Sequence, residues 1–148
     1  MLIQRVTQAR CHISGEVFSE IGKGLVVLVG VGCDETQEDI EWLGKKLVQM
    51  RIFDDQEGVM NLSVQDVEGD IMVVSQFTLH ASTKKGNRPS YFRAAGEAIS
   101  RPMYEKFVAS VEQALGKSVA TGEFGADMKV ELINDGPVTI WIDSRNRE

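Results

Sequence analysis

Two short, uninterrupted apolar runs constrain the fold of this chain more than any other feature of its sequence. Leu25 to Val31 lies between glycines, and Ile71 to Val74 forms the apolar first half of a second predicted strand, Ile71 to Leu79. Both runs are shorter than most helices and rich in valine, which is typical of buried strands. A strand that is apolar at every position has both faces covered. The runs therefore predict a sheet that is rolled into a barrel or packed on both faces.

Further strands and two helices are predicted around these runs. Leu2 to Val6 and Glu16 to Ile21 carry β-branched residues that favour a pair of strands near the N-terminus. Thr36 to Met50 and Arg101 to Leu115 repeat apolar residues at the spacing of an amphipathic helix. Thr36 and the aspartate three residues later, Asp39, resemble a capping box.

The second helix carries signals at both of its predicted ends. Ser100 is a candidate N-cap, Pro102 suits the first turn, and Gly116 suits the C-terminal end. Beyond it, Met128 to Ile133 alternates apolar and polar residues as a strand does, and Asn134 to Pro137 predicts a turn before the last strand. The predicted fold class is α+β: one domain, residues 1–148, with a mostly antiparallel, barrel-like sheet and two main helices.

Composition excludes several classes of protein. No apolar run is long enough to span a membrane, and the first ten residues lack the apolar core of a signal peptide. The two cysteines, Cys11 and Cys33, form no CxxC pair and are expected to be free thiols. These features predict a cytoplasmic protein with no membrane partner.

The charge of the chain limits how it could bind nucleic acid. A net charge of −6 argues against a protein that coats nucleic acids through bulk charge, so any RNA contact must be local. The only dense basic cluster in the middle of the chain contains Lys84, Lys85 and Arg88. Such a cluster is either a solvated loop or part of an RNA contact, and the sequence leaves both interpretations open.

The sequence lacks the motifs of common catalytic and cofactor sites. GxSxG, HExxH, Walker and GxGxxG motifs are absent. No spacing of His, Cys and carboxylate residues indicates a metal site. A triad of Ser75, His80 and Asp127 can be imagined, but nothing in the sequence supports its geometry. We therefore expect neither a metal ion nor a cofactor.

Two polar segments beside predicted strands are the strongest candidates for a site. Ser75 to Leu79 places hydrogen-bonding side chains and an aromatic ring at the end of an apolar strand. Asn134 to Thr139 contains a Gly-Pro bond, and a cis bond there would turn two backbone carbonyls toward one point. Taken singly, each segment is also compatible with an ordinary strand end or hairpin turn.

Together, the two segments resemble the signature motifs of D-aminoacyl-tRNA deacylases. The family's Ser-Gln-Phe-Thr motif matches Ser75 to Thr78, and its Asn-x-Gly-Pro-x-Thr motif matches Asn134 to Thr139. Shorter matches follow the family pattern in the same order over nearly the whole chain: Ile3 to Val6, Arg51 to Phe53, Met60 to Ser63, Arg88 to Ser90 and Thr121 to Met128. This collinear set is far more specific than a single motif.

The resemblance implies an enzyme that hydrolyses the ester bond of D-aminoacyl-tRNA as translational proofreading. Because glycine has no side chain that a steric filter could exclude, we also expect some activity on glycyl-tRNA. It implies a homodimer in which a cis Gly136-Pro137 bond of one subunit enters the active site of the other and excludes L-amino acids sterically. Arg5 would hold this motif in place. The implied chiral filter consists of six residues: Asn134, Asp135, Gly136, Pro137, Val138 and Thr139.

The resemblance also assigns roles around the end of the tRNA. The implied substrate-binding residues are Ser75, Gln76, Phe77, Met128, Gly136 and Pro137, and the implied catalytic residues are Gln76, Phe77 and Thr78. Phe77 would lie near the terminal adenine and Thr78 beside the scissile ester. Thr78 could act as a nucleophile, but the motif supplies no base to activate it. We favour activation of water by the 2′-hydroxyl of the terminal adenosine, with backbone amides near Phe77 and Thr78 stabilising the oxyanion.

Two other functions stay open from the sequence. A non-catalytic nucleic-acid-binding module would bind duplexes with steep salt dependence, although the acidic charge argues against it. A different editing enzyme on the same scaffold, with a trans Gly136-Pro137 bond, would accept certain L-aminoacyl-tRNAs.

Overall fold

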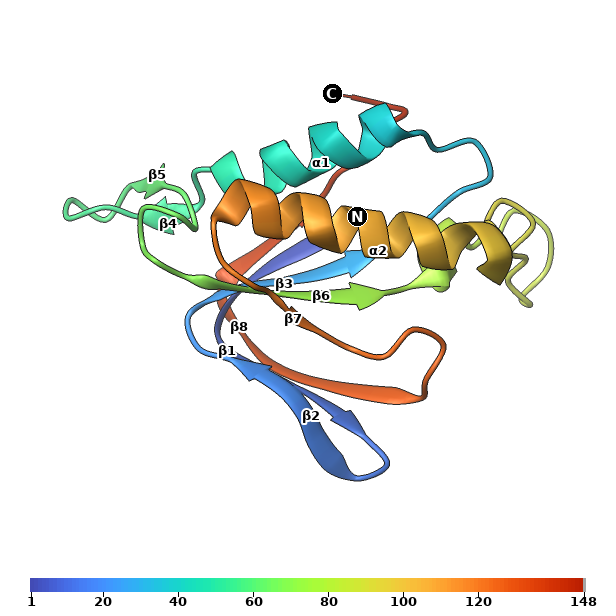
Figure 1. Ribbon diagram of the computed structural model, residues 1–148, viewed down its shortest axis with the longest axis horizontal. Helices are drawn as coiled ribbons and strands as arrows, with labels where there is room; N and C mark the ends of the chain where they lie inside the picture. Colours follow the sequence, from blue (N-terminus) through green and yellow to red (C-terminus); the bar gives the residue numbers. More distant parts are fainter. Residues whose placement is uncertain (148) are drawn as a thin grey trace.

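In the computed structural model, which describes residues 1–147, a curled six-stranded sheet lies against two α-helices (Figure 1). The strand order is β2-β1-β3-β6-β7, and β8 also pairs with β1. The sheet strands are β1 (Leu2–Ile13), β2 (Glu16–Ile21), β3 (Gly24–Val29), β6 (Asp70–Ser75), β7 (Ala120–Thr121) and β8 (Met128–Trp141). The other elements are α1 (Gln37–Gln49), β4 (Phe53–Asp54), β5 (Met60–Leu62), the 3₁₀ helix η1 (Phe77–His80) and α2 (Glu97–Leu115).

The sheet is mixed, with three antiparallel and two parallel strand pairs, so the predicted mostly antiparallel sheet is confirmed only in part. β1 pairs antiparallel with β2, β3 and β8, whereas β3 with β6 and β6 with β7 are parallel. Parallel neighbours need a long crossover connection, and here α1 lies between β3 and β6 and α2 between β6 and β7. Hydrophobic patterning identified β3 and β6 but did not establish their relative direction, and β7 was not predicted.

The two apolar runs are covered on both faces, as the sequence predicts. Leu25 and Val27 of β3 pack in the core beneath the helices, with Leu47 and Phe107 from α1 and α2. Between them, Val26 points to the opposite face and joins a second core inside the curl of the sheet. The alternation of side chains along a strand explains why every position in β3 is apolar.

The sheet closes nearly into a barrel because its two edges approach each other. The hydroxyl of Ser19 on β2 donates a hydrogen bond of 2.6 Å to the carbonyl of Thr121 on β7. The long strand β1 is shared between β3 at its start and β2 at its end, so the sheet bends around it. The barrel-like prediction is therefore confirmed. No helix within residues 1–147 is long and apolar enough to cross a membrane.

The helix ends agree with the sequence for α1 and differ for α2. Asp39 accepts hydrogen bonds from the backbone N–H and the hydroxyl of Thr36, which confirms the capping box. By contrast, α2 begins at Glu97 rather than Arg101. The hydroxyl of Ser100 bonds back to the Gly96 carbonyl inside the helix, so the prediction of Ser100 as N-cap was wrong.

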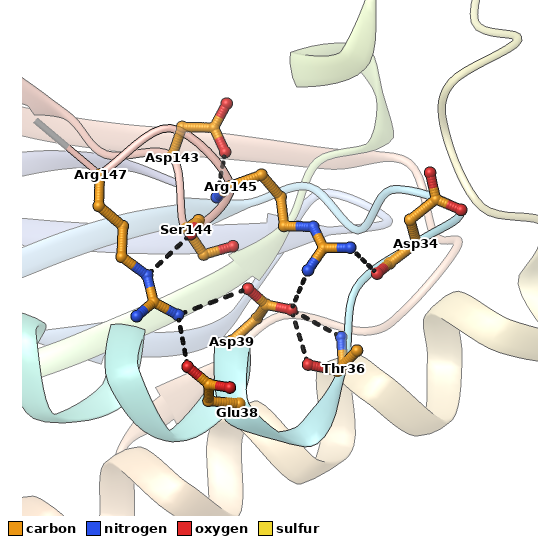
Figure 2. A network of polar contacts seen from close by, with 8 residues as sticks. All are labelled: Asp34, Thr36, Glu38, Asp39, Asp143, Ser144, Arg145 and Arg147. Atoms are coloured by element: carbon orange, nitrogen blue, oxygen red, sulfur yellow. Dashed lines mark hydrogen bonds and ion pairs between the residues drawn. The ribbon is translucent and has the colours of Figure 1, made fainter.

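Ion pairs and hydrogen bonds connect the C-terminal segment to the first turn of α1 (Figure 2). Figure 2 shows the guanidinium groups of Arg145 and Arg147 turned toward Asp39, whose side chain is 3% exposed. Burial would raise the pKa of Asp39. Hydrogen bonds from Thr36 and Ser144 and the charge of Arg145 outweigh it and lower that pKa below its usual value. The network therefore holds a buried carboxylate in its charged form.

Candidate active site

A pocket of about 320 Å³ opens where β3 and β6 end. Val29 and Ser75, which pair at the ends of these two strands, both line it. Gln76 and Phe77 follow on the same wall, and Met128 at the start of β8 contributes to the lining. Four of the predicted substrate-binding residues therefore meet in one cavity.

The chain turns sharply after β6, although the sequence predicted a strand as far as Leu79. The N–H of Gln76 donates a backbone hydrogen bond of 2.7 Å to the Val29 carbonyl at the end of β3. The 3₁₀ helix η1 then begins at Phe77. This turn leaves the Phe77 ring 58% exposed beside the pocket. The Phe77 and Tyr91 rings form a T-shaped pair with their centroids 5.0 Å apart. Phe77 is thus placed to stack on a planar ligand.

In the part of the chain that the structure describes, the predicted catalytic residue Thr78 does not line the pocket. The side-chain amide of Gln76 donates a hydrogen bond to the Thr78 oxygen. Two ionisable side chains line the pocket: Tyr104 and Asp127. Burial, with a smaller contribution from Cys11, raises the pKa of Tyr104 to about 12, so at neutral pH its hydroxyl is protonated and donates to the Val73 carbonyl. Asp127 is 86% exposed and forms an ion pair with Lys129.

The wall opposite Ser75 comes from α2 and the loop before β8. Ser100 and Tyr104 reach the pocket from α2, and Phe124 lies against Tyr104 with ring centroids 5.8 Å apart. Sequence reasoning missed these residues as site residues. The sequence placed Ser100 and Tyr104 at or within a predicted helix. Phe124 lies in a short segment that matches the family pattern, but the resemblance gives this residue no role.

Within residues 1–147 no cluster of His, Cys, Asp or Glu could hold a metal ion.

The second motif lies within a single long strand, not in the predicted turn between two strands. The Gly136-Pro137 bond inside β8 is cis, which confirms the expectation from the resemblance. Asn134 fixes this segment because its side-chain amide donates to the carbonyls of Arg5 (3.0 Å) and Val138 (2.9 Å). The ladder with β1 shifts register here, which accommodates the irregular backbone.

Arg5 contacts the motif as the resemblance implies. Arg5 is 6% exposed, and its Nε–H group donates a hydrogen bond of 3.2 Å to the carbonyl of Asp135. The same nitrogen lies 3.2 Å from the Asp135 carboxylate. On its other side, the guanidinium donates to the carbonyl of Ile52 at 2.7 Å and lies 3.3 Å from Asp54. The planar guanidinium of Arg5, which has several N–H donors, thus links Asp135, the residue before Gly136, to the β4 region.

The two motifs do not meet within one chain. None of the residues from Asn134 to Thr139 lines the pocket in the part of the chain that the structure describes. Arg5 pairs with Leu25 near the start of β3, whereas the pocket lies at Val29. Four residues of strand correspond to a rise of roughly 13 Å. The chain therefore carries the pocket and the cis Gly136-Pro137 segment at separate places.

Comparisons with known proteins give one consistent result. Residues 2–143 match the family described as D-Tyr-tRNA(Tyr) deacylase. The chain is 62% identical over 148 residues to a D-aminoacyl-tRNA deacylase of Flavobacterium johnsoniae, covering 100% of this chain and 99% of the relative. It is 63% identical over 145 residues to one of Parabacteroides distasonis, with 98% and 97% covered.

Solved structures share the fold. The structure of a c-Myc DNA Unwinding Element Binding Protein superposes with a TM-score of 0.89 at 37% identity, covering 94% of each chain. A probable eukaryotic D-amino acid tRNA deacylase superposes with a TM-score of 0.79 over 94% of this chain and 95% of its own, at 19% identity. The second likeness concerns the fold alone.

Proposed function

Because the chain belongs to the D-aminoacyl-tRNA deacylase family and is therefore a hydrolase, we propose that it cleaves the ester of D-aminoacyl-tRNA in the cytoplasm. The products are free tRNA and a free D-amino acid. The observation that carries the proposal is the gathering of Ser75, Gln76, Phe77 and Met128 in one pocket beside an exposed aromatic ring. The terminal adenosine stacks on Phe77, and the aminoacyl group extends into the cavity.

The chiral filter is completed by a second subunit. The distance between the pocket and Asn134 to Thr139 within one chain supports a homodimer in which each subunit supplies its motif to the other. The carbonyls of Gly136 and Pro137 then face the α-carbon of the substrate. An enzyme that accepts many side chains cannot select the D form by binding the side chain, whereas fixed backbone atoms reject the L form by collision. Glycine has no side chain to collide, so glycyl-tRNA is also hydrolysed.

Hydrolysis uses the substrate's own hydroxyl group. Two observations support this step: the Thr78 hydroxyl accepts a hydrogen bond from Gln76, and the ionisable side chains that line the pocket are a protonated tyrosine and an exposed, paired aspartate. The 2′-hydroxyl of the terminal adenosine helps to activate water. Backbone amides at Phe77 and Thr78, where η1 begins, stabilise the oxyanion.

A mixed-dimer experiment tests the cross-subunit arrangement. Phe77→Ala damages the pocket, and Gly136→Ala damages the motif because a Cβ there would collide with Val138 at a backbone φ of +120°. Each homodimer should lose D-specific deacylation. Co-expressed heterodimers should recover one intact site, formed by the pocket of one subunit and the motif of the other. If motif and pocket act within one chain, the heterodimer stays inactive.

Duplex DNA binding is a weaker second candidate, favoured by the likeness to a protein named for binding a DNA unwinding element. The net charge of −6 opposes it. Affinity for a DNA duplex that falls steeply with salt, together with no deacylation of D-tyrosyl-tRNA, would favour this function instead.

A further inference from the structure

The segment between η1 and α2 carries a concentration of positive charge that the rest of the chain lacks. No Asp or Glu occurs between Asp70 and Glu97, although the whole chain has 22 acidic residues. The same stretch holds four cations: Lys84, Lys85, Arg88 and Arg93. Within residues 1–147, none of the four has a carboxylate at ion-pair distance. These cations are therefore available to an anionic partner.

The backbone holds this segment in a defined shape. Ser82 and Ser90 exchange two backbone hydrogen bonds, of 2.7 and 2.9 Å, and close a small loop that carries three of the cations. At its far end, the N–H of Ala95 donates to the carbonyl of Val31, a residue that lines the pocket. In Figure 1 the segment, in yellow, projects beyond the start of α2. The loop is thus anchored to the rim of the pocket.

Aromatic rings connect the pocket to the loop. Phe77 at the pocket touches Tyr91, and Phe92 follows with 73% of its surface exposed, the most exposed of the large hydrophobic residues. Exposed rings beside unpaired cations are the combination that single-stranded nucleic acids bind, since bases stack on the rings and phosphates lie near the cations.

We propose that Tyr91, Phe92 and the loop from Ser82 to Ser90 bind the unpaired nucleotides that precede the terminal adenosine of tRNA. The bases stack on the two rings, and Lys84, Lys85 and Arg88 lie along the phosphates. This inference rests on the proposed function, because Phe77 places the terminal adenosine at one end of the surface. Residues 81–96 then recognise the part of the RNA that precedes the reacting nucleotide.

Two probes separate this surface from the pocket. One is an acceptor-stem minihelix with its unpaired 3′ end, carrying D-tyrosine through a non-hydrolysable amide. The other is the terminal adenosine alone with the same amide-linked D-tyrosine. Phe92→Ser should weaken minihelix binding about tenfold, the effect of losing one stacked base, and should leave adenosine-analogue binding unchanged. Phe18→Ser is the matched control, because Phe18 is 52% exposed on β2, and it should alter neither affinity.

The cations are tested by salt dependence. Lys84→Gln/Lys85→Gln should reduce the slope of log Kd against log salt by about 1.4 for the minihelix, since each single-strand phosphate contact contributes about 0.7. Lys45→Gln/Lys106→Gln, two exposed cations on the helices, should leave the slope unchanged.

The outcomes separate the surface from the function on which it rests. Equal minihelix binding by wild type, Phe92→Ser and the Lys84/Lys85 variant would overturn the surface while leaving the pocket intact. Failure of the wild type to bind the adenosine analogue would instead refute the proposed function. A Phe92→Ser protein that becomes monomeric would assign this ring to the subunit interface and also overturn the proposal.

Discussion

Replacing the buried Arg5 by methionine should destabilise the protein and relax its choice between D and L substrates. The methionine keeps much of the aliphatic volume of arginine but loses every donor to Ile52, Asp54 and Asp135. The two carboxylates are 51% and 40% exposed, so water can replace arginine there and each ion pair contributes less than about 1 kcal/mol.

The two backbone acceptors account for most of the expected loss. The hydrogen bond from Arg5 to the Ile52 carbonyl is buried, and a charged hydrogen bond of this kind contributes about 1.5–3 kcal/mol. Together with the bond to the Asp135 carbonyl, we expect the free energy of unfolding to fall by about 3 kcal/mol. A motif displaced by about 1 Å should reduce kcat/KM for D-tyrosyl-tRNA roughly 100-fold.

The assays are urea unfolding and deacylation of matched D- and L-tyrosyl-tRNA. Arg10→Met is the control on the same strand, because Arg10 is about half exposed and pairs only with Glu20 at the surface. It should change stability by less than about 0.5 kcal/mol and leave selectivity intact. An Arg5→Met protein that matches this control in both assays would refute the argument that Arg5 positions the motif.

Three further substitutions test separate parts of the account. Thr78→Ala should retain deacylation within about tenfold if the tRNA hydroxyl activates water; a loss of several orders of magnitude with substrate binding kept would make Thr78 the nucleophile. Asp39→Asn should lower the free energy of unfolding by about 2 kcal/mol at neutral pH. Because the pKa of Asp39 is lowered on folding, the wild-type advantage should be constant above about pH 5 and shrink as pH falls below about 4, and a pH-independent difference in urea titrations would contradict this assignment. Gly24→Ala should cost about 3 kcal/mol, since its Cβ would collide with the Asp70 backbone, whereas Gly22→Ala meets no atom within 4 Å and should be nearly neutral in the same titrations.

Sequence reasoning succeeded where the signal is local. The apolar runs at β3 and β6 identified strands covered on both faces, and Thr36 with Asp39 located the start of α1. Both patterns depend on neighbours within a few residues. The capping box also specified contacts that the structure contains, since the carboxylate and hydroxyl can reach each other only across one helical turn.

The errors arise where distant segments decide the outcome. The parallel pairing of β3 with β6 depends on the crossover through α1, and the apolar runs alone do not specify which strands pair or in which direction. The segment from Asn134 to Pro137 looks like a turn, yet pairing with β1 keeps it within β8. Tyr104 enters the pocket wall because α2 packs over the strand ends, whereas the sequence indicated only that this residue belongs to the predicted helix Arg101 to Leu115.

The most direct test of the central claim is deacylation of D-tyrosyl- and L-tyrosyl-tRNA by the purified protein, measured side by side. We expect rapid release of D-tyrosine while L-tyrosyl-tRNA remains intact. Release of both amino acids at similar rates would contradict a chiral filter formed by Gly136 and Pro137. Release of neither, with RNA still bound, would contradict the enzymatic function itself.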